Sequence, residues 1–199
     1  MVHHHYLYLI RHLPTAGNEK RQYIGWTDEP IVSSHGKSRL HAFGNVETVY
    51  GSDLLRAKQS AVVYFPEAAY SADSRWRECH FGEFEGKTYA ELEMDKGYRA
   101  WLDDPRGAAP RGGECLAEVE ARVRAALVDV PSGSIVVTHG GPIRSILSHF
   151  SPGKPADFWS WSVPHGSVWK LTWRHYDELK EGLPCISLSE VPITENRNS

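Results

Sequence analysis

Short apolar runs alternate along the chain with segments whose hydrophobic residues recur at helical spacing. The apolar runs are rich in strand-forming residues and lie at residues 6–10, 46–50 and 135–138. The segments of helical spacing lie at residues 54–65, 116–127 and 142–150. Strands that alternate with helices are typical of an α/β fold. We therefore expect a three-layer α/β/α sandwich with a mostly parallel central sheet.

The chain is expected to form one domain over residues 1–176. Its 199 residues, of which 41% are hydrophobic, suffice for one substantial core. Residues 87–111 show weaker periodicity and mixed charges, and this pattern predicts a helical excursion beside the sheet. Residues 177–199 are expected to form a polar, peripheral C-terminal tail.

Charge and cysteine content narrow the class of protein. The formal net charge is -3, which argues against nucleic acid or a membrane surface as partner, because binders of either usually present a basic face. An anion must therefore meet locally placed cations. The cysteines Cys79, Cys115 and Cys185 form no CxxC pair, so we expect neither a disulfide framework nor a thiolate metal site. The first residues lack a signal-peptide pattern, and a cytoplasmic location is expected.

Two of the expected strands end on histidines followed by loop-type residues. Arg11 and His12 follow the first run, and His139 and Gly140 follow the run at 135–138. Ligands of open α/β sheets bind outside the carboxyl ends of the strands. Phosphoryl transfer needs positive charge around the phosphoryl oxygens, a nucleophile in line with the leaving oxygen, and an acid for that oxygen. The two strand ends supply residue types that suit these roles.

Five segments, in order, carry a resemblance to a known family. They are LIRHLPTAGN, SDLLRAKQSA, RWRECHFGEFEG, APRGGE and VVTHGGPIR. Together they resemble the histidine phosphatase superfamily, also called the phosphoglycerate mutase-like family, over roughly residues 6–150. The resemblance implies the phosphoglycerate mutase-like form of the sandwich, a small-molecule phosphate ester as partner, and catalysis without a metal or another cofactor.

The resemblance also assigns roles to individual residues. His12 matches the nucleophile that becomes a phosphohistidine, and Glu78 matches the proton donor. The positions that match phosphate-binding residues are Arg11, Asn18, Arg56, His139 and Gly140. Glu83 and Glu85 lie close to Glu78 in sequence and compete with it for the acid role. Arg144 is expected to form a salt bridge along its own helix rather than to bind phosphate.

The residues after His12 depart from the family pattern. The family usually has glycine and then an acidic residue there, whereas this chain has Leu13 and Pro14. Leu13 is bulkier than glycine, and Pro14 has neither an N–H nor a carboxylate. We therefore expect the shape and charge of the pocket floor to differ from the family pattern. Together with YIGWTDEPI and HFGEFEGKTYAEL, this departure resembles the branch of α-ribazole phosphatases, which act in adenosylcobalamin biosynthesis. The hypothesis is therefore hydrolysis of α-ribazole 5′-phosphate.

Other functions stay open at this point. A broad-specificity phosphatase or a phosphoglycerate mutase is the alternative within the family, and a noncatalytic phosphate-binding regulatory module is the alternative class. A histidine-rich metal-binding protein would use the run His3–His5 with His35 or His41, but adjacent strand residues face opposite sides. We therefore expect no metal site there. The sequence leaves a homodimer open.

Overall fold

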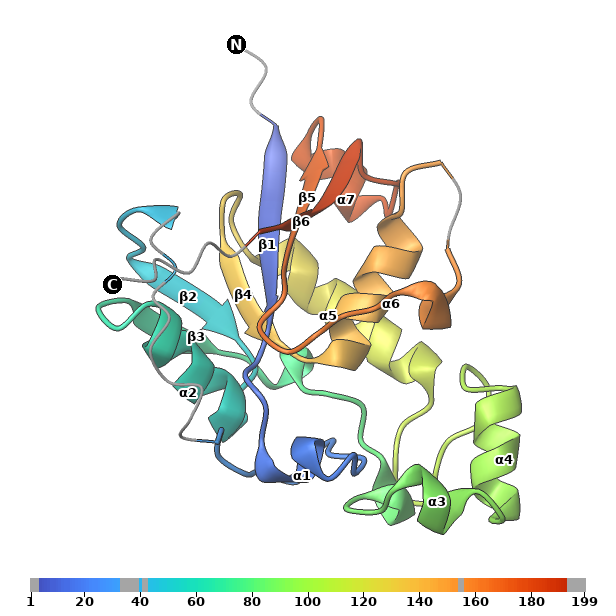
Figure 1. The fold of residues 1–199 in the computed structure, drawn as a ribbon. Helices are drawn as coiled ribbons and strands as arrows, with labels where there is room; N and C mark the ends of the chain where they lie inside the picture. The colour runs from blue at the N-terminus through green and yellow to red at the C-terminus, as the bar shows by residue number, and fades with distance from the viewer. Residues whose placement is uncertain (1–3, 33–39, 41–42, 154–155, 193–199) are drawn as a thin grey trace.

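The computed structural model of the protein describes residues 4–32, 40, 43–153 and 156–192. The strands are β1 (His5–Arg11), β2 (Thr48–Gly51), β3 (Ala69–Ala72), β4 (Ile135–Thr138), β5 (Val168–Trp173) and β6 (Ser187–Val191). The α-helices are α1 (Ala16–Glu19), α2 (Leu55–Tyr64), α3 (Tyr89–Leu92), α4 (Lys96–Asp103), α5 (Leu116–Asp129), α6 (Gly140–Phe150) and α7 (Tyr176–Lys180). Helix α2 covers one face of the sheet, and α5 and α6 cover the other (Figure 1).

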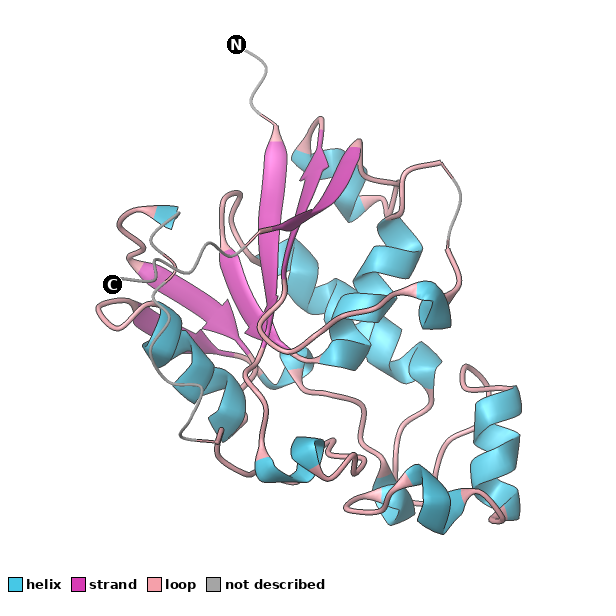
Figure 2. Ribbon diagram, in the orientation of Figure 1, coloured by secondary structure: helices cyan, strands magenta, loops and turns pink. Residues whose placement is uncertain are grey.

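The six strands form one sheet in the order β3-β2-β4-β1-β5-β6. Strands β3, β2, β4 and β1 run parallel, whereas β5 and β6 join by antiparallel pairing. Figure 2 shows the helices on both sides of this sheet. The expected α/β fold with a mostly parallel central sheet is therefore confirmed. The parallel strands all end at the lower edge of the sheet in Figure 1, close to α1.

The central strands β1 and β4 are buried on both faces. Leu7 and Leu9 pack into the core cluster shared with α5 and α6, whereas Ile10 faces the cluster beside α2. In β4, Val136 and Val137 divide in the same way. A strand buried on both faces is a continuous apolar run rather than an alternating one. This burial explains why both runs stand out in the sequence.

The segment expected to form a polar C-terminal tail contains helix α7, which begins at residue 176, and strand β6 at 187–191. Strand β6 is an edge strand of the sheet, and Leu179 and Cys185 are 1% and 3% exposed in the core. The sequence shows no apolar run at this strand, because an edge strand is held mainly by main-chain hydrogen bonds and needs few apolar side chains. The remainder of that segment, 193–199, lies outside the described residues.

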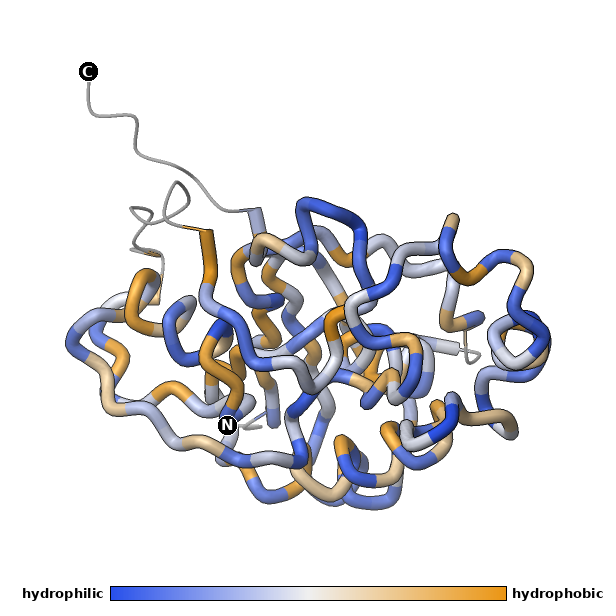
Figure 3. Tube along the Cα trace, turned by 90° about the horizontal axis from the view of Figure 1, so that it is seen from below, coloured by the Kyte–Doolittle hydropathy of each residue, from blue (hydrophilic) through white to orange (hydrophobic). Residues whose placement is uncertain are grey.

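A small helical unit stands beside the sheet edge where the parallel strands end (Figure 1). It contains α3, α4 and the short 3-10 helix Gly82–Phe84. Its own hydrophobic cluster consists of Phe84, Leu92, Tyr98 and Trp101. Viewed from below, hydrophobic and hydrophilic stretches alternate along the chain, and many hydrophobic stretches lie in the middle of the molecule (Figure 3). The unit thus has a separate apolar centre and forms one wall beside the strand ends.

Candidate active site

The ends of β1 and β4 bring two histidines together. Arg11 is in register with Thr138, the last residue of β4, and the backbone N–H of His12 donates to the carbonyl of Thr138 at 2.9 Å. The rings of His12 and His139 lie 4.9 Å apart between centroids. His12 is 3% exposed and His139 is fully buried. Parallel pairing of two neighbouring strands thus places both imidazoles in one site.

The ring of His12 is fixed through one of its nitrogens. Its Nδ1 lies 2.6 Å from the carbonyl oxygen of Leu13. A carbonyl can only accept, so Nδ1 carries the proton and Nε2 keeps its lone pair. The Leu13 N–H donates to Ser60 Oγ at 2.8 Å, and Ser60 donates to the Arg56 carbonyl at 2.6 Å. Helix α2 therefore holds the peptide that orients His12.

Leu13 places its bulk in the core rather than in the pocket floor. Its side chain is 8% exposed and belongs to the hydrophobic cluster beside α2. Pro14 lacks an N–H, but its carbonyl accepts a hydrogen bond from Val32 at 2.9 Å. The departure from glycine after the Arg-His pair thus leaves the main-chain contacts of His12 in place.

His139 presents the opposite tautomer. Its Nδ1 accepts a hydrogen bond from Arg56 Nε at 3.3 Å, so the ring proton sits on Nε2. Nε2 is buried and has no hydrogen-bond partner among the described residues. A buried donor without a partner costs free energy, and its persistence here points to a ligand acceptor.

Arg56 is fully buried at the start of α2 and is aimed by backbone carbonyls. Its guanidinium donates to Gly25 at 2.5 Å and to Thr27 at 2.9 Å. Burial lowers the pKa of Arg56, and nearby Glu78 opposes this effect most strongly. Because these carbonyls occupy part of the guanidinium, the loop at residues 24–27 decides where Arg56 points.

Glu85 holds that loop. Its carboxylate accepts from the backbone N–H groups of Gly25 at 3.0 Å, Trp26 at 2.8 Å and Phe81 at 3.2 Å. It also accepts from the Thr27 hydroxyl at 2.8 Å. Sequence reasoning considered Glu85 only as a rival to Glu78. Its contacts assign it a positioning role, which acts on the site through Arg56.

Glu85→Gln is expected to lower kcat/KM about 10-fold and unfolding free energy by about 1–3 kcal/mol, because an amide nitrogen replaces one acceptor oxygen among crowded donors. Steady-state kinetics and chemical denaturation measure both effects. Glu83→Gln is the matched control, since Glu83 is exposed two residues away. Equal effects of the two substitutions would contradict the positioning role.

Glu78 lies beside the N-terminus of α6. Its carboxylate accepts from Gly141 N–H at 3.0 and 3.1 Å and from Cys79 N–H at 2.9 Å. The side chain is buried, with the residue 8% exposed. A Cβ on Gly141 would lie 2.1 Å from Glu78 Oε1, so only glycine leaves room for this carboxyl. Among the three neighbouring glutamates, Glu78 is thus the one held at the site edge.

Side-chain donors hold the main chain at and before Glu78 through hydrogen bonds to its carbonyls. Its carbonyl accepts from the indole of Trp26 at 2.9 Å and from Arg122 at 2.9 Å. Arg122 also donates to the carbonyls of Arg75 and Arg77, at 2.9 and 2.6 Å. A guanidinium that bridges several carbonyls in this way fixes the backbone of the segment 75–78, and with it the base of the Glu78 side chain.

Arg11 adds a second guanidinium beside α6. It donates to the Val163 carbonyl at 2.5 Å, while its Nε is buried without a hydrogen-bond partner among the described residues. Burial lowers the pKa of Arg11 to about 10, with Glu78 opposing this effect, so the group remains charged at neutral pH. A Cβ on Gly140 would approach the Arg11 Cζ to 3.3 Å. Gly140 thus allows the guanidinium to lie against the helix start.

Within the described part of the chain, the hydrogen bonds of Asn18 are local. Its Oδ1 accepts from Thr15 N–H at 3.2 Å, and its own N–H donates to Thr15 Oγ1 at 3.3 Å. This reciprocal pair caps α1. The contacts of Asn18 thus do not link it to the two histidines, and its phosphate-binding role stays a prediction.

Two neighbours of the site were not expected. The ring of His165 lies 5.2 Å from that of His12 between centroids. Arg144 makes no salt bridge along its helix among the described residues, which corrects the expectation for it, and instead donates to the Trp161 carbonyl at 3.0 Å. Both contacts come from residues 161–165, a loop that tertiary folding brings beside the strand ends.

The histidine run at the N-terminus lies apart from this site. His4 is exposed, and His5 is buried with its ring 5.3 Å from that of Tyr176. His3, His35 and His41 lie outside the described residues. Within the described part of the chain, no group of three or more His, Cys, Asp or Glu is arranged to hold a metal ion.

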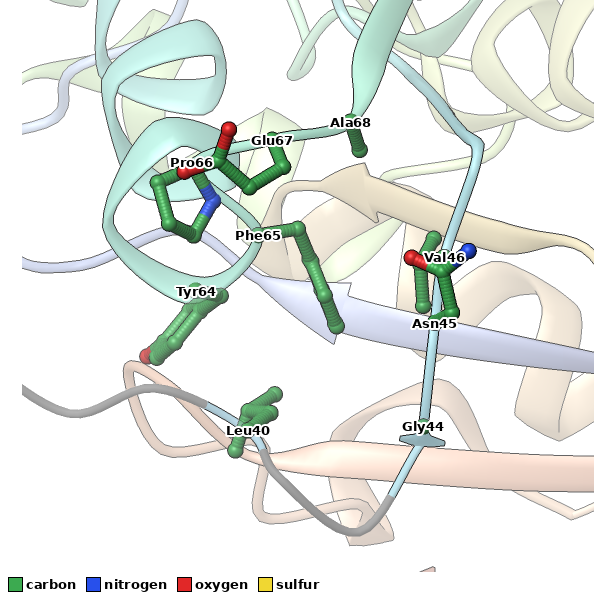
Figure 4. Close-up of a pocket in the computed structure, with 9 residues that line it drawn as sticks. All are labelled: Leu40, Gly44, Asn45, Val46, Tyr64, Phe65, Pro66, Glu67 and Ala68. Atoms are coloured by element: carbon green, nitrogen blue, oxygen red, sulfur yellow. The ribbon is translucent and has the colours of Figure 1, made fainter.

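Away from the two histidines, a pocket of about 310 Å³ lies between the end of α2 and residues 44–46 (Figure 4). Its lining is mostly apolar and includes Tyr64 and Phe65, with Glu67 as its charged residue. Among the described residues that line it, none is a cationic side chain that could bind an anion. The strand-end site, with its arginines and histidines, is the better candidate for phosphate binding.

The pKa values of both site histidines make stability pH-dependent. Burial, followed by the charge of Arg56, lowers the pKa of His12 and of His139 well below 6.5. The unfolded chain binds these protons first, so stability is complete above about pH 6.5 and falls below it by about 1.4 kcal/mol per pH unit for each histidine.

We expect His139→Gln to flatten this decline between about pH 6.5 and 5, above the range in which unfolded carboxylates titrate. Denaturant titrations of both proteins across this range measure the difference. Parallel curves for the two proteins would show that His139 does not titrate as stated.

Taken together, the site holds a neutral imidazole with a free lone pair, a buried N–H donor, two guanidinium groups and a carboxyl. The lone pair on His12 can attack an electrophile. The guanidinium groups and the His139 N–H can stabilise negative charge that develops on that electrophile. The carboxyl of Glu78 can exchange a proton at the edge of the site.

Comparison with known proteins gives matches over most of the chain. The model of the family described as histidine phosphatase superfamily (branch 1) matches residues 7–182. A Hydrogenobacter thermophilus protein named "Putative phosphoserine phosphatase 2" is 32% identical over 154 residues, which are 71% of this chain and 76% of the relative. A Klebsiella pneumoniae protein named "Probable phosphoglycerate mutase GpmB" is 31% identical over 158 residues, 71% of this chain and 73% of the relative.

A solved structure shares the fold. The α-ribazole phosphatase from Shigella flexneri superposes with a TM-score of 0.72 at 24% sequence identity, covering 86% of this chain and 92% of that one. In the described part of the chain, none of the helices combines the length and apolar character needed to cross a membrane.

Proposed function

The chain belongs to the histidine phosphatase superfamily (branch 1), and from this premise we propose that it hydrolyses small phosphate monoesters through a phosphohistidine on His12. The observation that carries the proposal is the pair of opposite tautomers at the strand ends. His12 keeps a lone pair on Nε2, and His139 keeps a proton on Nε2. A nucleophile and a donor to the phosphoryl oxygens are thus side by side.

In the first step, His12 Nε2 attacks phosphorus, and the bond from phosphorus to the ester oxygen breaks. Glu78 in its acid form gives its proton to the departing alkoxide. Arg11, Arg56 and the His139 N–H bind the phosphoryl oxygens as their charge is redistributed. The products of this step are an alcohol, a phosphohistidine and the Glu78 carboxylate.

In the second step, water attacks the phosphohistidine. The Glu78 carboxylate takes a proton from that water, so the group returns to its acid form and His12 leaves with its lone pair restored. Inorganic phosphate is released. One carboxyl therefore serves both half-reactions, which fits its place at the edge of the site rather than under the phosphate.

We propose that the reaction needs no metal. The arginines supply the positive charge that Mg²⁺ supplies in other phosphoryl-transfer enzymes. Turnover that persists in EDTA at the untreated rate supports this part of the proposal, and loss of turnover that Mg²⁺ or Zn²⁺ restores overturns it.

As substrate we propose α-ribazole 5′-phosphate, with a role in adenosylcobalamin biosynthesis. The sequence segments around His12 and Glu78 support it, and the solved structure with this activity in its name shares the fold. Phosphoglycerate mutase activity is the second candidate, because a relative carries that name. A noncatalytic phosphate-binding module is the third, and the intact set of His12, Glu78 and His139 speaks against it.

A substrate panel tests these candidates. We expect kcat/KM for α-ribazole 5′-phosphate to exceed that for 3-phosphoglycerate, phosphoserine, sugar phosphates and nucleoside monophosphates. Similar low values for all of them would favour a broad-specificity phosphatase. Interconversion of 2- and 3-phosphoglycerate without phosphate release would instead identify a mutase, and phosphate binding without turnover a regulatory module.

A further inference from the structure

A pocket of about 110 Å³ adjoins the candidate acid. Its lining comes from the loop before β2, the helical unit and the segments around α6, and comprises Tyr23, Glu78, Cys79, Phe81, Trp101, Pro105, Leu116, Gly141, Arg144, Phe158 and Trp159. We call it the aromatic pocket. Its volume is of the same order as that of an apolar cavity of about 150 Å³ that binds benzene, which is the scale of one small ring.

The aromatic side chains of this pocket contact one another. The ring of Phe81 lies 5.1 Å from that of Tyr23 and 6.0 Å from that of Trp101. Trp159 lies 6.4 Å from Trp101 and 4.9 Å from Phe158. These contacts are edge-to-face, so the lining consists of aromatic rings packed on one another, and a planar aromatic ring is a ligand that such a lining favours. Trp159 is 50% exposed, so it stands at the rim.

Two donors accompany the rings. The indole Nε1 of Trp101 is buried without a hydrogen-bond partner among the described residues, although Trp101 is only 5% exposed. Arg144 lies with its Cζ 6.0 Å from the centroid of Phe158 and forms no salt bridge within the described chain. Arg144 donates through Nε to the Trp161 carbonyl, so the Trp101 N–H is the unpaired donor of the two. A buried unpaired donor, with a guanidinium beside it that can make further hydrogen bonds, favours a ligand that brings acceptors.

The aromatic pocket lies where the leaving group of the ester is expected, because it adjoins the candidate acid. Glu78 and Gly141, whose N–H holds the carboxyl, both line it. In an in-line displacement the leaving oxygen is opposite the nucleophile, and it must lie next to the acid that protonates it. The alcohol part of the ester therefore extends into the aromatic pocket when the phosphoryl group faces His12.

We propose that the aromatic pocket selects phosphomonoesters whose alcohol carries a planar aromatic ring with acceptor atoms on its edge. Trp159 packs against the ring at the rim, and Arg144 donates to the ring edge. The inference rests on the proposed phosphatase function and defines the chemical class of its leaving group.

Benzyl phosphate and cyclohexylmethyl phosphate test the preference for a planar ring, because in both the P–O bond that breaks joins phosphorus to a CH₂–O group and the product is a primary alcohol. We expect wild-type kcat/KM to be about 3- to 10-fold higher for benzyl phosphate. Trp159→Ala is expected to bring the ratio close to one. Met94→Ala is the matched control, since Met94 is 88% exposed and does not line the pocket, and it should keep the wild-type ratio.

Pyridylmethyl phosphates test the donors. We expect at least one ring isomer to exceed benzyl phosphate several-fold in kcat/KM, and Arg144→Met to remove this gain. Arg174→Met controls for the loss of an arginine, since the Arg174 side chain is 64% exposed and pairs with Glu178. If no isomer exceeds benzyl phosphate, the assignment of Arg144 is wrong.

The outcomes separate this inference from the function on which it rests. Equal wild-type kcat/KM for benzyl and cyclohexylmethyl phosphate overturns the pocket assignment and leaves the phosphatase standing. No hydrolysis of either ester, or of p-nitrophenyl phosphate, overturns the phosphatase. Calorimetry with benzylphosphonate and cyclohexylmethylphosphonate then tests the pocket by binding alone, and equal affinities overturn it.

Discussion

Replacing His12 with asparagine is expected to lower phosphatase turnover by at least about 10³-fold, because the substitution removes the imidazole that keeps a lone pair on Nε2 for the attack on phosphorus. His165 and His139 are the neighbouring imidazoles, with ring centroids 5.2 and 4.9 Å from that of His12. The Nδ1 of His139 is occupied by Arg56, and its Nε2 carries a proton, so it lacks the lone pair that the reaction needs.

The assay follows p-nitrophenyl phosphate hydrolysis in EDTA together with trapping of labelled phosphate on the protein. The wild type should yield phosphate that is labile in acid and stable in alkali, as expected of phosphohistidine, and His12→Asn should yield none. His175→Asn serves as control, because His175 is exposed at the start of α7. Wild-type rates in His12→Asn would overturn covalent catalysis by this residue.

Glu78→Gln is expected to show the second largest effect, a loss of about 10² to 10⁴-fold with alkyl phosphates. Glutamine keeps an oxygen that can accept from Gly141 N–H, so the carboxyl site stays filled while the transferable proton is gone. A leaving group as acidic as p-nitrophenol needs little protonation. The loss in the first step should therefore be much smaller for p-nitrophenyl phosphate than for alkyl esters.

The second step distinguishes this variant further. Without a carboxylate to activate water, phosphohistidine should accumulate in Glu78→Gln, and p-nitrophenol should appear as a burst close to one equivalent per enzyme. Rapid-mixing absorbance and phosphate trapping measure the burst and the intermediate. Glu83→Gln, in the exposed neighbouring glutamate, should behave as the wild type. Uniform losses across all leaving groups, without a burst, would contradict the acid and base roles of Glu78.

The two histidines of the candidate site depend on contacts that begin at Glu85, which is far from both of them in sequence. Glu85 holds residues 25–27, whose carbonyls aim Arg56, and Arg56 in turn fixes the tautomer of His139. Ser60 on the same helix holds the peptide that orients His12. Helix α2 thus couples the two imidazoles, and disturbing the Glu85 contacts should affect both half-reactions.

The sequence by itself determined the central strands, the helices that cover them and the residue types at the strand ends. The runs at 6–10 and 135–138 are visible because strands buried on both faces are continuously apolar, and β1 and β4 lie where the runs predict. Arg11, His12 and His139 follow those strands directly, so parallel pairing alone brings them together.

Only the tertiary structure decided the rest, because it depends on contacts between distant segments. Strand β6 is held by pairing with β5 and has little apolar pattern of its own. The assignment among Glu78, Glu83 and Glu85 depends on which carboxyl meets Gly141 N–H, 63 residues away from Glu78 in sequence. The aromatic pocket joins residues from 23 to 159. The local sequence pattern does not predict such contacts, since they join segments that are far apart in sequence and form only when the core has packed.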